Sequence, residues 1–534
     1  MSKAIRGADV VIQSLLDAGI RKIFTLSGNH VMSIFDAAIE SAITLIHTRH
    51  EAAAVSMADA YARISGTVGV ALVTGGAGHV NALGALCSAR AGETPLLLLS
   101  GHAPLAEYGN GAFQELDQVA LAAPLTKASW TSQSVASLRN DLARGMRIAR
   151  SGRPGPVHIS LPSDVLDTLA EQDGATIDML ATDIQPLAQE AAHEVMQRLR
   201  AADRPLVIAP PALCTGSGRV ALGRLSQIGL PVIAMESPRG LNDPSLGRIA
   251  ELLGDADLVL LLGKALDFTL NFGSPTVSAC SWMIIDPEAT LLDRAKRLLK
   301  NPPVLRVLAD PLAAIESLLV EAGDQPVASI GWSTKVSSAV AYRPFVIRSG
   351  GLDSAVLCAA VASFLNDCDR PVFVSDGGEI GQWAQALIDV PDRIINGVAG
   401  AIGPSIPFAI GAKAAAPDRP VLAVLGDGTF GFHMAEFETA VRHGLPFIGV
   451  IGNDGCWNAE RQLQRRKYGE ARAIGCSLDQ ETRYDQVVSA LGGHGEFVDT
   501  ASALIPALKR ALLSNRPACV NVLIDGLPAP VVRQ

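Results

Sequence analysis

Short runs of apolar residues recur along the chain and alternate with longer stretches whose apolar positions follow helical spacing. The clearest pair of runs is Val421–Leu425 and Phe447–Ile451, with a helical stretch at about Met434–His443 between them. A strand that is apolar on both faces is typical of a parallel sheet covered by helices. We therefore predict a β-α-β unit here, with Gly426-Asp427-Gly428 as a tight turn after its first strand.

The same alternation occurs in three successive sets of predicted strands. The first set comprises Ile23–Leu26, Ile43–His47, Val68–Thr74, Leu96–Ser100 and Val157–Leu161. The second comprises Leu206–Ala209, Val232–Met235, Leu258–Leu262, Met283–Asp286 and Leu305–Leu308. The third comprises Val372–Ser375, Val421–Leu425, Phe447–Ile451 and Cys519–Ile524. Polar stretches at about 167–183 and 322–351 are predicted linkers. The fold class is therefore α/β, with three doubly wound, mostly parallel-sheet domains at 1–170, 185–325 and 350–534.

Charge and composition narrow the classes of protein that fit. The 534 residues carry a net charge of −9, which argues against nucleic acid as a partner. The eight cysteines are scattered without a CxxC pair, so we expect reduced thiols and a cytoplasmic protein. The N-terminal stretch predicts an amphipathic helix and not a secretory signal. With no run of 18 apolar residues, we expect no membrane partner.

Two acidic residues follow neighbouring strands of the β-α-β unit. Asp427 comes after the first strand, and Asp454 comes after the second. The carboxyl ends of parallel strands meet at one sheet edge, where ligands bind in α/β folds. Two oxygen ligands beside the free N–H groups of a helix start suit a divalent cation that holds a diphosphate. The sequence leaves open whether Asn453 or Asp454 points at the metal.

The Gly-Asp-Gly turn followed about 26 residues later by Asn453-Asp454 resembles the signature of thiamine-diphosphate enzymes. This resemblance implies thiamine diphosphate and Mg²⁺ as cofactors, with Asp427, Asp454 and the carbonyl of Cys456 as metal ligands. The chain departs from the family's usual Asn-Asn pair, although Asp454 keeps an oxygen ligand. The order of the three domains is similar to the decarboxylase and acetohydroxyacid synthase superfamily, which implies pyrimidine-binding, central and diphosphate-binding domains. The central domain shows no GxGxxG loop and no candidate chemistry.

The resemblance also implies a set of cofactor contacts. Ile402 matches an apolar residue that wedges between the two cofactor rings, and the Gly400 carbonyl would accept the 4′-amino hydrogen. A plain glycine turn with a core isoleucine is the alternative. The remaining implied contacts to the diphosphate, the pyrimidine ring and the metal loop are Gly76, Gly78, Asn81, Gly377, Gly378, Glu379, Gly426, Gly428, Thr429, Asn453 and Trp457.

Glu51, in Arg49-His50-Glu51-Ala52-Ala53, matches the glutamate that protonates the cofactor's aminopyrimidine ring. A carboxyl buried against an apolar helix start has a raised pKa and can share a proton with a ring nitrogen. The alternative is a carboxylate stabilised by the helix dipole. In this family the cofactor spans two subunits, which implies a homodimer or a homotetramer with intersubunit active sites.

The segments FTLSGNHVMSIF, HTRHEAAA and QELDQVALAAPLTK look like benzaldehyde lyase and 2-hydroxyacyl-CoA lyases. The resemblance implies that His30 and Gln114 relay protons to and from a substrate hydroxyl, and that the substrate is an aldehyde, an acyloin or an acyl-CoA. Glu460 lies where pyruvate decarboxylase has an active-site glutamate. It is either a second acid/base or an exposed helix residue. The basic run from Arg461 to Arg472 either holds an anionic substrate or is a solvated helix face.

The main expectation is a C–C lyase or carboligase acting on 2-hydroxy carbonyl compounds. A 2-keto acid decarboxylase and an acetolactate synthase-like transferase, with or without flavin, remain as alternatives. Acetohydroxyacid synthases have an apolar residue in place of His30 and an aromatic residue in place of Leu463, which weakens the second alternative. The non-enzymatic alternative is a degenerate homologue that serves as a scaffold. The presence of Glu51, Asp427 and Asp454, the residues expected to bind the cofactor, argues against it.

Overall fold

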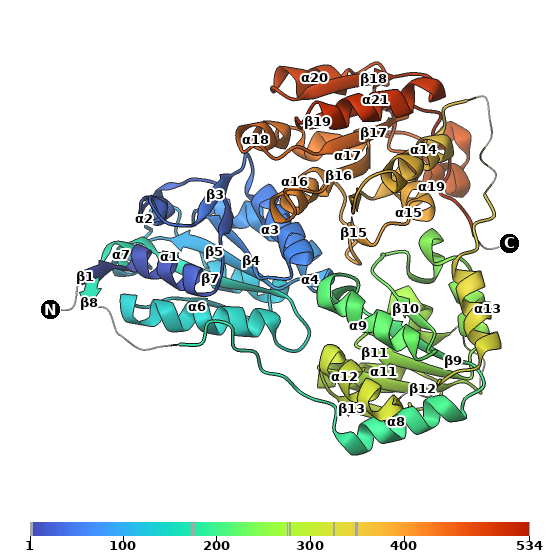
Figure 1. Cartoon of the computed structure of the whole chain (residues 1–534). Coiled ribbons are helices and arrows are strands. Elements are labelled where there is room, and N and C mark those ends of the chain that lie inside the picture. The colour runs from blue at the N-terminus through green and yellow to red at the C-terminus, as the bar shows by residue number, and fades with distance from the viewer. Residues whose placement is uncertain are drawn as a thin grey trace.

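The computed structural model describes residues 4–171, 177–274, 276, 279–323, 326–345, 347 and 351–532. Within them, three parallel sheets are each flanked by helices, which confirms the predicted α/β class (Figure 1). None of the helices in this part of the chain combines the length and apolarity needed to span a bilayer. The predicted domain limits at 325, 350 and 534 fall outside the described residues, and the division at the stated limits stays a prediction.

The N-terminal sheet has the order β3-β2-β4-β5-β7-β6, with every neighbouring pair parallel. Its strands are β2 (Lys22–Thr25), β3 (Thr44–His47), β4 (Gly69–Val73), β5 (Leu96–His102), β6 (Ser129–Thr131) and β7 (Pro156–Pro162). Its helices are α1 (Gly7–Asp17), α2 (Met32–Ala38), α3 (Glu51–Ser65), α4 (Ala77–Ala91), α5 (Gln118–Ala122), α6 (Val135–Arg150) and α7 (Ser163–Asp167). A small antiparallel pair, β1 (Ala4–Arg6) with β8 (Leu169–Glu171), occupies the chain start and part of the predicted first linker.

The central sheet has the order β10-β9-β11-β12-β13, also parallel throughout. Its strands are β9 (Pro205–Ala209), β10 (Val232–Ala234), β11 (Leu258–Leu262), β12 (Ser281–Asp286) and β13 (Leu305–Leu308). Its helices are α8 (Gln189–Ala201), α9 (Gly216–Gln227), α10 (Ile249–Asp255), α11 (Ala289–Leu298), α12 (Pro311–Ala322) and α13 (Ile330–Val340). α13 lies in the predicted second linker and packs on this sheet, because Trp332 is buried and its Nε1 donates to the Pro205 carbonyl at 2.7 Å.

The C-terminal sheet has the order β15-β14-β16-β17-β19-β18. Its strands are β14 (Val372–Ser375), β15 (Asp392–Ile395), β16 (Val421–Gly426), β17 (Ile448–Asn453), β18 (His494–Val498) and β19 (Ala518–Leu523). Its helices are α14 (Ser354–Asn366), α15 (Gly378–Leu387), α16 (Ser405–Ala415), α17 (Asp427–His433), α18 (Glu436–Arg442), α19 (Asn458–Tyr468), α20 (Tyr484–Ala490) and α21 (Ala501–Leu513). The two strands that the sequence did not predict, β15 and β18, are the edges of this sheet.

The structure corrects the predicted turn after β16. Gly426 is extended, with φ −85° and ψ 163°, and caps α17, which begins at Asp427. The Thr429 hydroxyl accepts the Gly426 N–H at 3.2 Å and lies 3.1 Å from the Gly426 carbonyl. The helix predicted at about 434–443 is confirmed as α18, and α17 is an additional short helix before it. As a result Asp427 lies in the first turn of a helix and not in a free loop.

The N-terminal and C-terminal parts meet where α3 packs against α16 (Figure 1). At Gly411 in α16 the two helices approach so closely that an added Cβ would lie 2.2 Å from the Met57 carbonyl oxygen. Nearby, the Arg49 N–H donates to Glu436 Oε1 at 3.0 Å. This helix contact fixes how the two outer sheets are placed within one chain.

We expect Gly411→Ala to lower stability by about 1–3 kcal/mol, because the new methyl group would overlap rigid backbone in a packed core. The matched control is Gly223→Ala in α9, where an added Cβ meets nothing within 4 Å. That change should be neutral or stabilising by up to about 1 kcal/mol. Calorimetric unfolding of both variants measures the difference, and equal unfolding temperatures would show that the α3–α16 contact tolerates expansion.

Candidate active site

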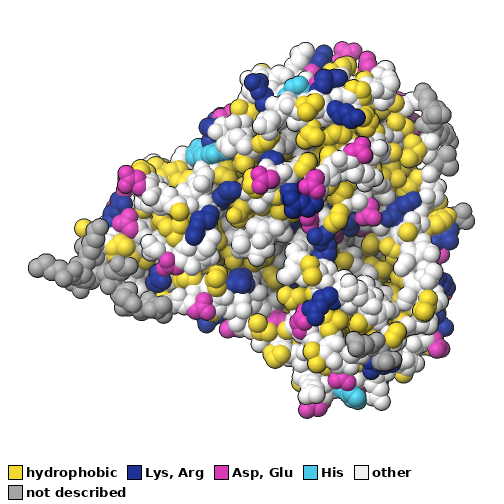
Figure 2. Space-filling view, in the orientation of Figure 1, with side chains coloured by type: hydrophobic (Ala, Val, Ile, Leu, Met, Phe, Trp, Pro, Cys, Tyr) yellow, Lys and Arg dark blue, Asp and Glu magenta, His cyan; other side chains and the backbone are white. Residues whose placement is uncertain are grey.

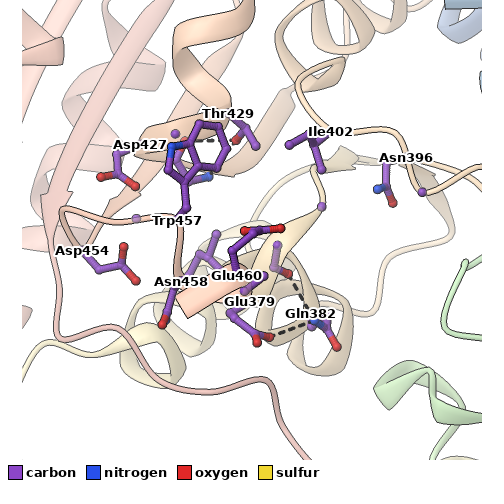
Figure 3. Close-up of a pocket in the computed structure, with 18 of the residues that line it drawn as sticks. Glu379, Gln382, Asn396, Ile402, Asp427, Thr429, Asp454, Trp457, Asn458 and Glu460 are labelled. Carbon is purple, nitrogen blue, oxygen red and sulfur yellow. Dashed lines mark hydrogen bonds between the residues drawn. The ribbon is translucent and has the colours of Figure 1, made fainter. Parts of the chain in front are cut away.

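Two carboxylates lie side by side at the carboxyl ends of neighbouring strands. β16 and β17 are paired so that Gly426 lies opposite Gly452, and each strand leads into one of the two acids. Asp427 and Asp454 both line a cavity of about 370 Å³ (Figure 3). Asn453 does not line it, because its amide donates to the Gln480 carbonyl at 3.0 Å and to Asn521 Oδ1 at 3.3 Å. Of the Asn453-Asp454 pair, the aspartate is therefore the residue placed at the cavity.

The electrostatics of this pair fit a bound cation. Asp427 is only 3% exposed, and its Oδ2 has no hydrogen-bond partner among the described residues. Burial, and then the neighbouring charge of Asp454, raise the pKa of Asp427 to about 7. Burial also raises the pKa of Asp454. An unpaired buried carboxylate is costly, and a divalent cation between these two groups would remove that cost.

The protein alone supplies only part of a metal's coordination shell. Among the described residues, no group of three or more His, Cys, Asp or Glu side chains is placed to hold a metal. A hard cation with six or more oxygen ligands would therefore need backbone carbonyls, water or ligand oxygens besides the two aspartates. This donor set fits a cation that is bound together with a diphosphate.

Glycines keep the cavity open beside the two acids. An added Cβ would lie 2.7 Å from Ile402 Cγ2 at Gly377, and 2.8 Å from the Trp457 ring at Gly428. Ile402 and Trp457 both line the cavity, as do the predicted cofactor contacts Gly378, Glu379, Gly400, Gly426, Thr429 and Cys456. The structure therefore places almost all of the cofactor contacts predicted in the C-terminal part around one cavity.

Glu379 and Glu460 line the same cavity and differ in environment. Glu379, in the first turn of α15, is 8% exposed, accepts from Gln382 Nε2 at 2.9 Å, and has a pKa raised mainly by burial. Glu460, in the first turn of α19, is exposed, and Figure 3 shows it between the Asp427 side and the Glu379 side. Because Glu460 is exposed at the cavity, a bound ligand can reach its carboxyl group.

Asp376 organises the cavity walls and was not predicted. Its side chain is fully buried, and its Oδ1 accepts the N–H groups of Gly377 at 2.7 Å and Gly403 at 2.9 Å. Its Oδ2 accepts from the Ser405 N–H at 3.3 Å. One carboxylate thus ties the loop after β14 to the turn before α16. The sequence signal for this role is an acid between an apolar strand and a glycine pair.

A second cluster gathers at the carboxyl edge of the N-terminal sheet. Glu51 begins α3, is 8% exposed, and accepts from Asn81 Nδ2 at 3.1 Å. An added Cβ at Gly78 would lie 3.2 Å from Glu51 Oε1. Gly76 is held by Gln118, a buried and unpredicted residue whose Oε1 accepts the Gly76 N–H at 2.9 Å. The four residues predicted to face the pyrimidine ring therefore lie together.

His30 and Gln114 lie beside this cluster. His30 is 6% exposed, its Nδ1 lies 3.1 Å from Thr74 Oγ1, and its ring stacks on Phe113 with centroids 6.0 Å apart. Burial lowers the pKa of His30, and a hydrogen bond with the Phe113 backbone offsets part of that shift. Gln114 has a left-handed backbone with φ 56°, and its Cβ would be 2.6 Å from a Cβ added at Gly76. A strained non-glycine residue here is typical of a functional loop.

The two clusters remain separate within one chain. None of Glu51, His30, Asn81 and Gln114 is among the residues that line the cavity with Asp427. Each chain thus presents two partial sites, one on the N-terminal sheet and one on the C-terminal sheet.

The central part also lines the cavity, although its sequence marked no candidate chemistry. Ser237, Pro238 and Arg239, in the loop after β10, line the cavity with the C-terminal residues. Pro238 lies against the Gly400 turn, where an added Cβ would be 3.6 Å from Pro238 Cβ. Only the fold brings this loop to the site, so no local motif marks it.

Comparisons with known proteins agree with this arrangement. The family model "Thiamine pyrophosphate enzyme, N-terminal TPP binding domain" matches residues 5–121, and "Thiamine pyrophosphate enzyme, C-terminal TPP binding domain" matches residues 376–522. A probable acetolactate synthase of Mycobacterium bovis is 32% identical over 542 residues, covering 98% of this chain and 96% of the relative. A 2-hydroxyacyl-CoA lyase 2 of Caenorhabditis elegans is 29% identical over 577 residues, covering 97% and 89%.

A 2-hydroxyacyl-CoA lyase of Oryza sativa subsp. japonica is 28% identical over 562 residues, covering 98% of this chain and 96% of the relative. Both cofactor-binding halves are matched, and the similarity extends through the central part. The resemblance predicted from the sequence is confirmed: the chain belongs to the thiamine pyrophosphate enzymes, whose cofactor is also called thiamine diphosphate.

Proposed function

We propose that this enzyme is a Mg²⁺-dependent C–C lyase or carboligase that acts on 2-hydroxy carbonyl compounds, either acyloins or 2-hydroxyacyl-CoA, and releases or joins aldehydes. The observation that carries the proposal is the placement of His30 and Gln114 next to the Glu51 cluster. A lyase needs a group that takes the proton from the substrate hydroxyl when the C–C bond breaks, and His30 supplies one.

In this proposal Asp427, Asp454 and the Cys456 carbonyl hold Mg²⁺, and the glycine-lined space beside them takes the diphosphate. When bound, thiamine diphosphate supplies a nucleophilic carbon and accepts the negative charge that develops on the acyl carbon. The residues around it bind, orient and move protons.

Glu51 is the proposed proton-sharing partner of the pyrimidine ring, because it is a buried carboxyl held by the Asn81 amide. It would act from a second copy of the chain, since it does not line the cavity of its own C-terminal part. A homodimer or a homotetramer with active sites between subunits follows from this arrangement. We propose a cytoplasmic location, which fits the eight free cysteines of the described residues.

Burial lowers the pKa of His30 from its ordinary value of 6.5, which favours the neutral imidazole. A neutral imidazole keeps one nitrogen lone pair, which can take the hydroxyl proton of an acyloin and later return it. Gln114 donates and accepts hydrogen bonds without changing charge, and it would orient the hydroxyl.

We expect His30→Ala to reduce acyloin cleavage by about 10²–10⁴-fold, as removal of a general base does. Calorimetric binding of thiamine diphosphate with Mg²⁺ should stay unchanged. His193→Ala is the control, because its side chain is 66% exposed and lies on α8. The substrate panel is benzoin, acetoin, a 2-hydroxyacyl-CoA, pyruvate and benzoylformate, with products read by mass. Full cleavage activity in the His30 variant would remove His30 from the mechanism.

Acetolactate formation or 2-keto acid decarboxylation is the second candidate function. It is favoured by the relative named a probable acetolactate synthase and by Glu460 at the cavity. In both reactions the first C–C bond breaks by loss of CO₂, which needs no hydroxyl base, so we expect pyruvate turnover to survive in the His30 variant and to fall in Glu460→Gln. A wild-type protein that bound no thiamine diphosphate with Mg²⁺ present would instead support a scaffold.

A further inference from the structure

A loop of the central part brings a positive charge into the cavity. Arg239 follows Pro238, which lies against the Gly400 turn, and its backbone N–H donates to Ser237 Oγ at 3.2 Å. This hydrogen bond lies within the loop and tightens its turn, and Arg239 lines the cavity with Ile402 and Glu379. Figure 2 shows basic and acidic side chains close together where the central and C-terminal parts meet.

Within the part of the chain that the structure describes, the Arg239 guanidinium has no hydrogen-bond or ion-pair partner. The nearest acid in its own loop, Glu236, is already paired with Arg393 at 2.7 Å. By contrast, Arg461 and Arg465 of the basic run on α19 both pair with Glu470. Five N–H donors at the cavity are therefore left for a ligand.

The charged groups around Arg239 do not neutralise it by contact. Burial raises the pKa of Glu379, and Arg239 and then Arg466 lower it in part, so both arginines act on this carboxyl from a distance. Glu379 itself accepts from Gln382. Glu460 is exposed on α19 and has no ion pair among the described residues. Arg239 is thus the one Lys or Arg among the described residues that line the cavity, whose other charged residues are Glu379, Asp427, Asp454 and Glu460.

We propose that Arg239 binds a negatively charged group of the substrate, so that the substrate is an anionic carbonyl compound. This inference rests on the proposed function and adds the chemical class of its substrate. The planar guanidinium fork matches the oxygens of a carboxylate or a phosphate and binds them with two hydrogen bonds. The anionic group is either the carboxylate of a 2-oxo or 2-hydroxy acid, or a phosphate of an acyl-CoA.

The test compares anionic and neutral substrates in the holoenzyme. In Arg239→Gln we expect kcat/KM for the anionic substrate to fall about 10–100-fold through KM, since one charged hydrogen-bonding group is lost. Cleavage of neutral benzoin or acetoin should change less than about twofold, and Arg239→Lys should recover part of the loss. Arg472→Gln is the control, because Arg472 is exposed in the same basic region and does not line the cavity.

The two sources of the anionic group give different results. Selective loss with the 2-hydroxyacyl-CoA identifies a phosphate, and selective loss with benzoylformate or pyruvate identifies a carboxylate. Equal loss for neutral and anionic substrates, no loss for either, or weaker thiamine diphosphate binding in Arg239→Gln would overturn the inference. A wild-type enzyme that cleaves no acyloin or CoA ester would refute the proposed function alone. Calorimetric binding of benzoylformate to the holoenzyme would then still test Arg239.

Discussion

Asp427→Ala is expected to abolish Mg²⁺-dependent binding of thiamine diphosphate, and activity with it. Asp427 would be a direct metal ligand, and loss of groups that merely support a ligand already costs about 10–100-fold in metal affinity. We therefore expect the affinity for Mg²⁺ and cofactor to fall by at least about 100-fold. Calorimetric titration with thiamine diphosphate, with and without Mg²⁺, measures the effect.

In the ligand-free protein, the Asp427→Ala change should not lower stability. Asp427 Oδ2 has no partner among the described residues, and burial raises the pKa of this carboxyl to about 7. A buried, unsatisfied carboxyl destabilises the fold, so its removal should leave the unfolding temperature of the ligand-free protein unchanged or higher. Asp479→Ala, an exposed acid, is the matched control. A large fall in the stability of the ligand-free Asp427 variant would show that this side chain serves the fold instead of a cation.

Glu51→Gln should bind thiamine diphosphate and Mg²⁺ nearly as well as the wild type, and turn over about 10²–10⁴-fold more slowly. The glutamine oxygen can still accept from Asn81 Nδ2, so the local packing is kept. What is lost is the titratable proton that the pyrimidine ring is proposed to share. Single-turnover rates and cofactor titrations separate these effects. Near-normal turnover would assign Glu51 the alternative role of a carboxylate stabilised by the helix dipole.

The buried interior of each sheet could be predicted from apolar runs alone. β11 and β14 have the predicted limits, because fully buried parallel strands leave uninterrupted apolar sequence. β13 also has its predicted limits, although it is an edge strand whose residues are alternately half-buried and exposed. The edge strands β15 and β18 contain charged and half-exposed residues such as Asp392, Arg393 and Glu496, so no apolar run marks them. The start of α17 was missed for a different reason. Two glycines in Gly426-Asp427-Gly428 predict a turn, whereas the Thr429 hydroxyl and the extended Gly426 make the segment a helix start.

The residues of the candidate site could be predicted from the sequence where a recognisable motif directly follows a buried strand. Asp427, Gly377, Ile402 and Trp457 share one cavity, as their positions after buried strands and turns indicate. The choice between Asn453 and Asp454 required the packed structure, because Gln480 and Asn521 engage the Asn453 amide from distant parts of the chain. Gln118 acts through a contact that no local pattern encodes, and only the fold brings Arg239 to the cavity. Asp376 does have a local signal, an acid between an apolar strand and a glycine pair, although it was not among the predicted residues.

Complementation between two inactive variants tests the shared active site most directly. A mixed dimer of Glu51→Gln and Asp427→Ala chains contains one site built from two intact parts and one built from two altered parts. Because a symmetric dimer repeats the same contact twice, random mixing of equal amounts should restore about one quarter of the wild-type activity. The two chains are co-expressed with separate tags, which verify that mixed dimers have formed, and activity is measured on the unselected mixture. Recovery near one quarter is the predicted result, and no recovery in verified mixed dimers would contradict the account.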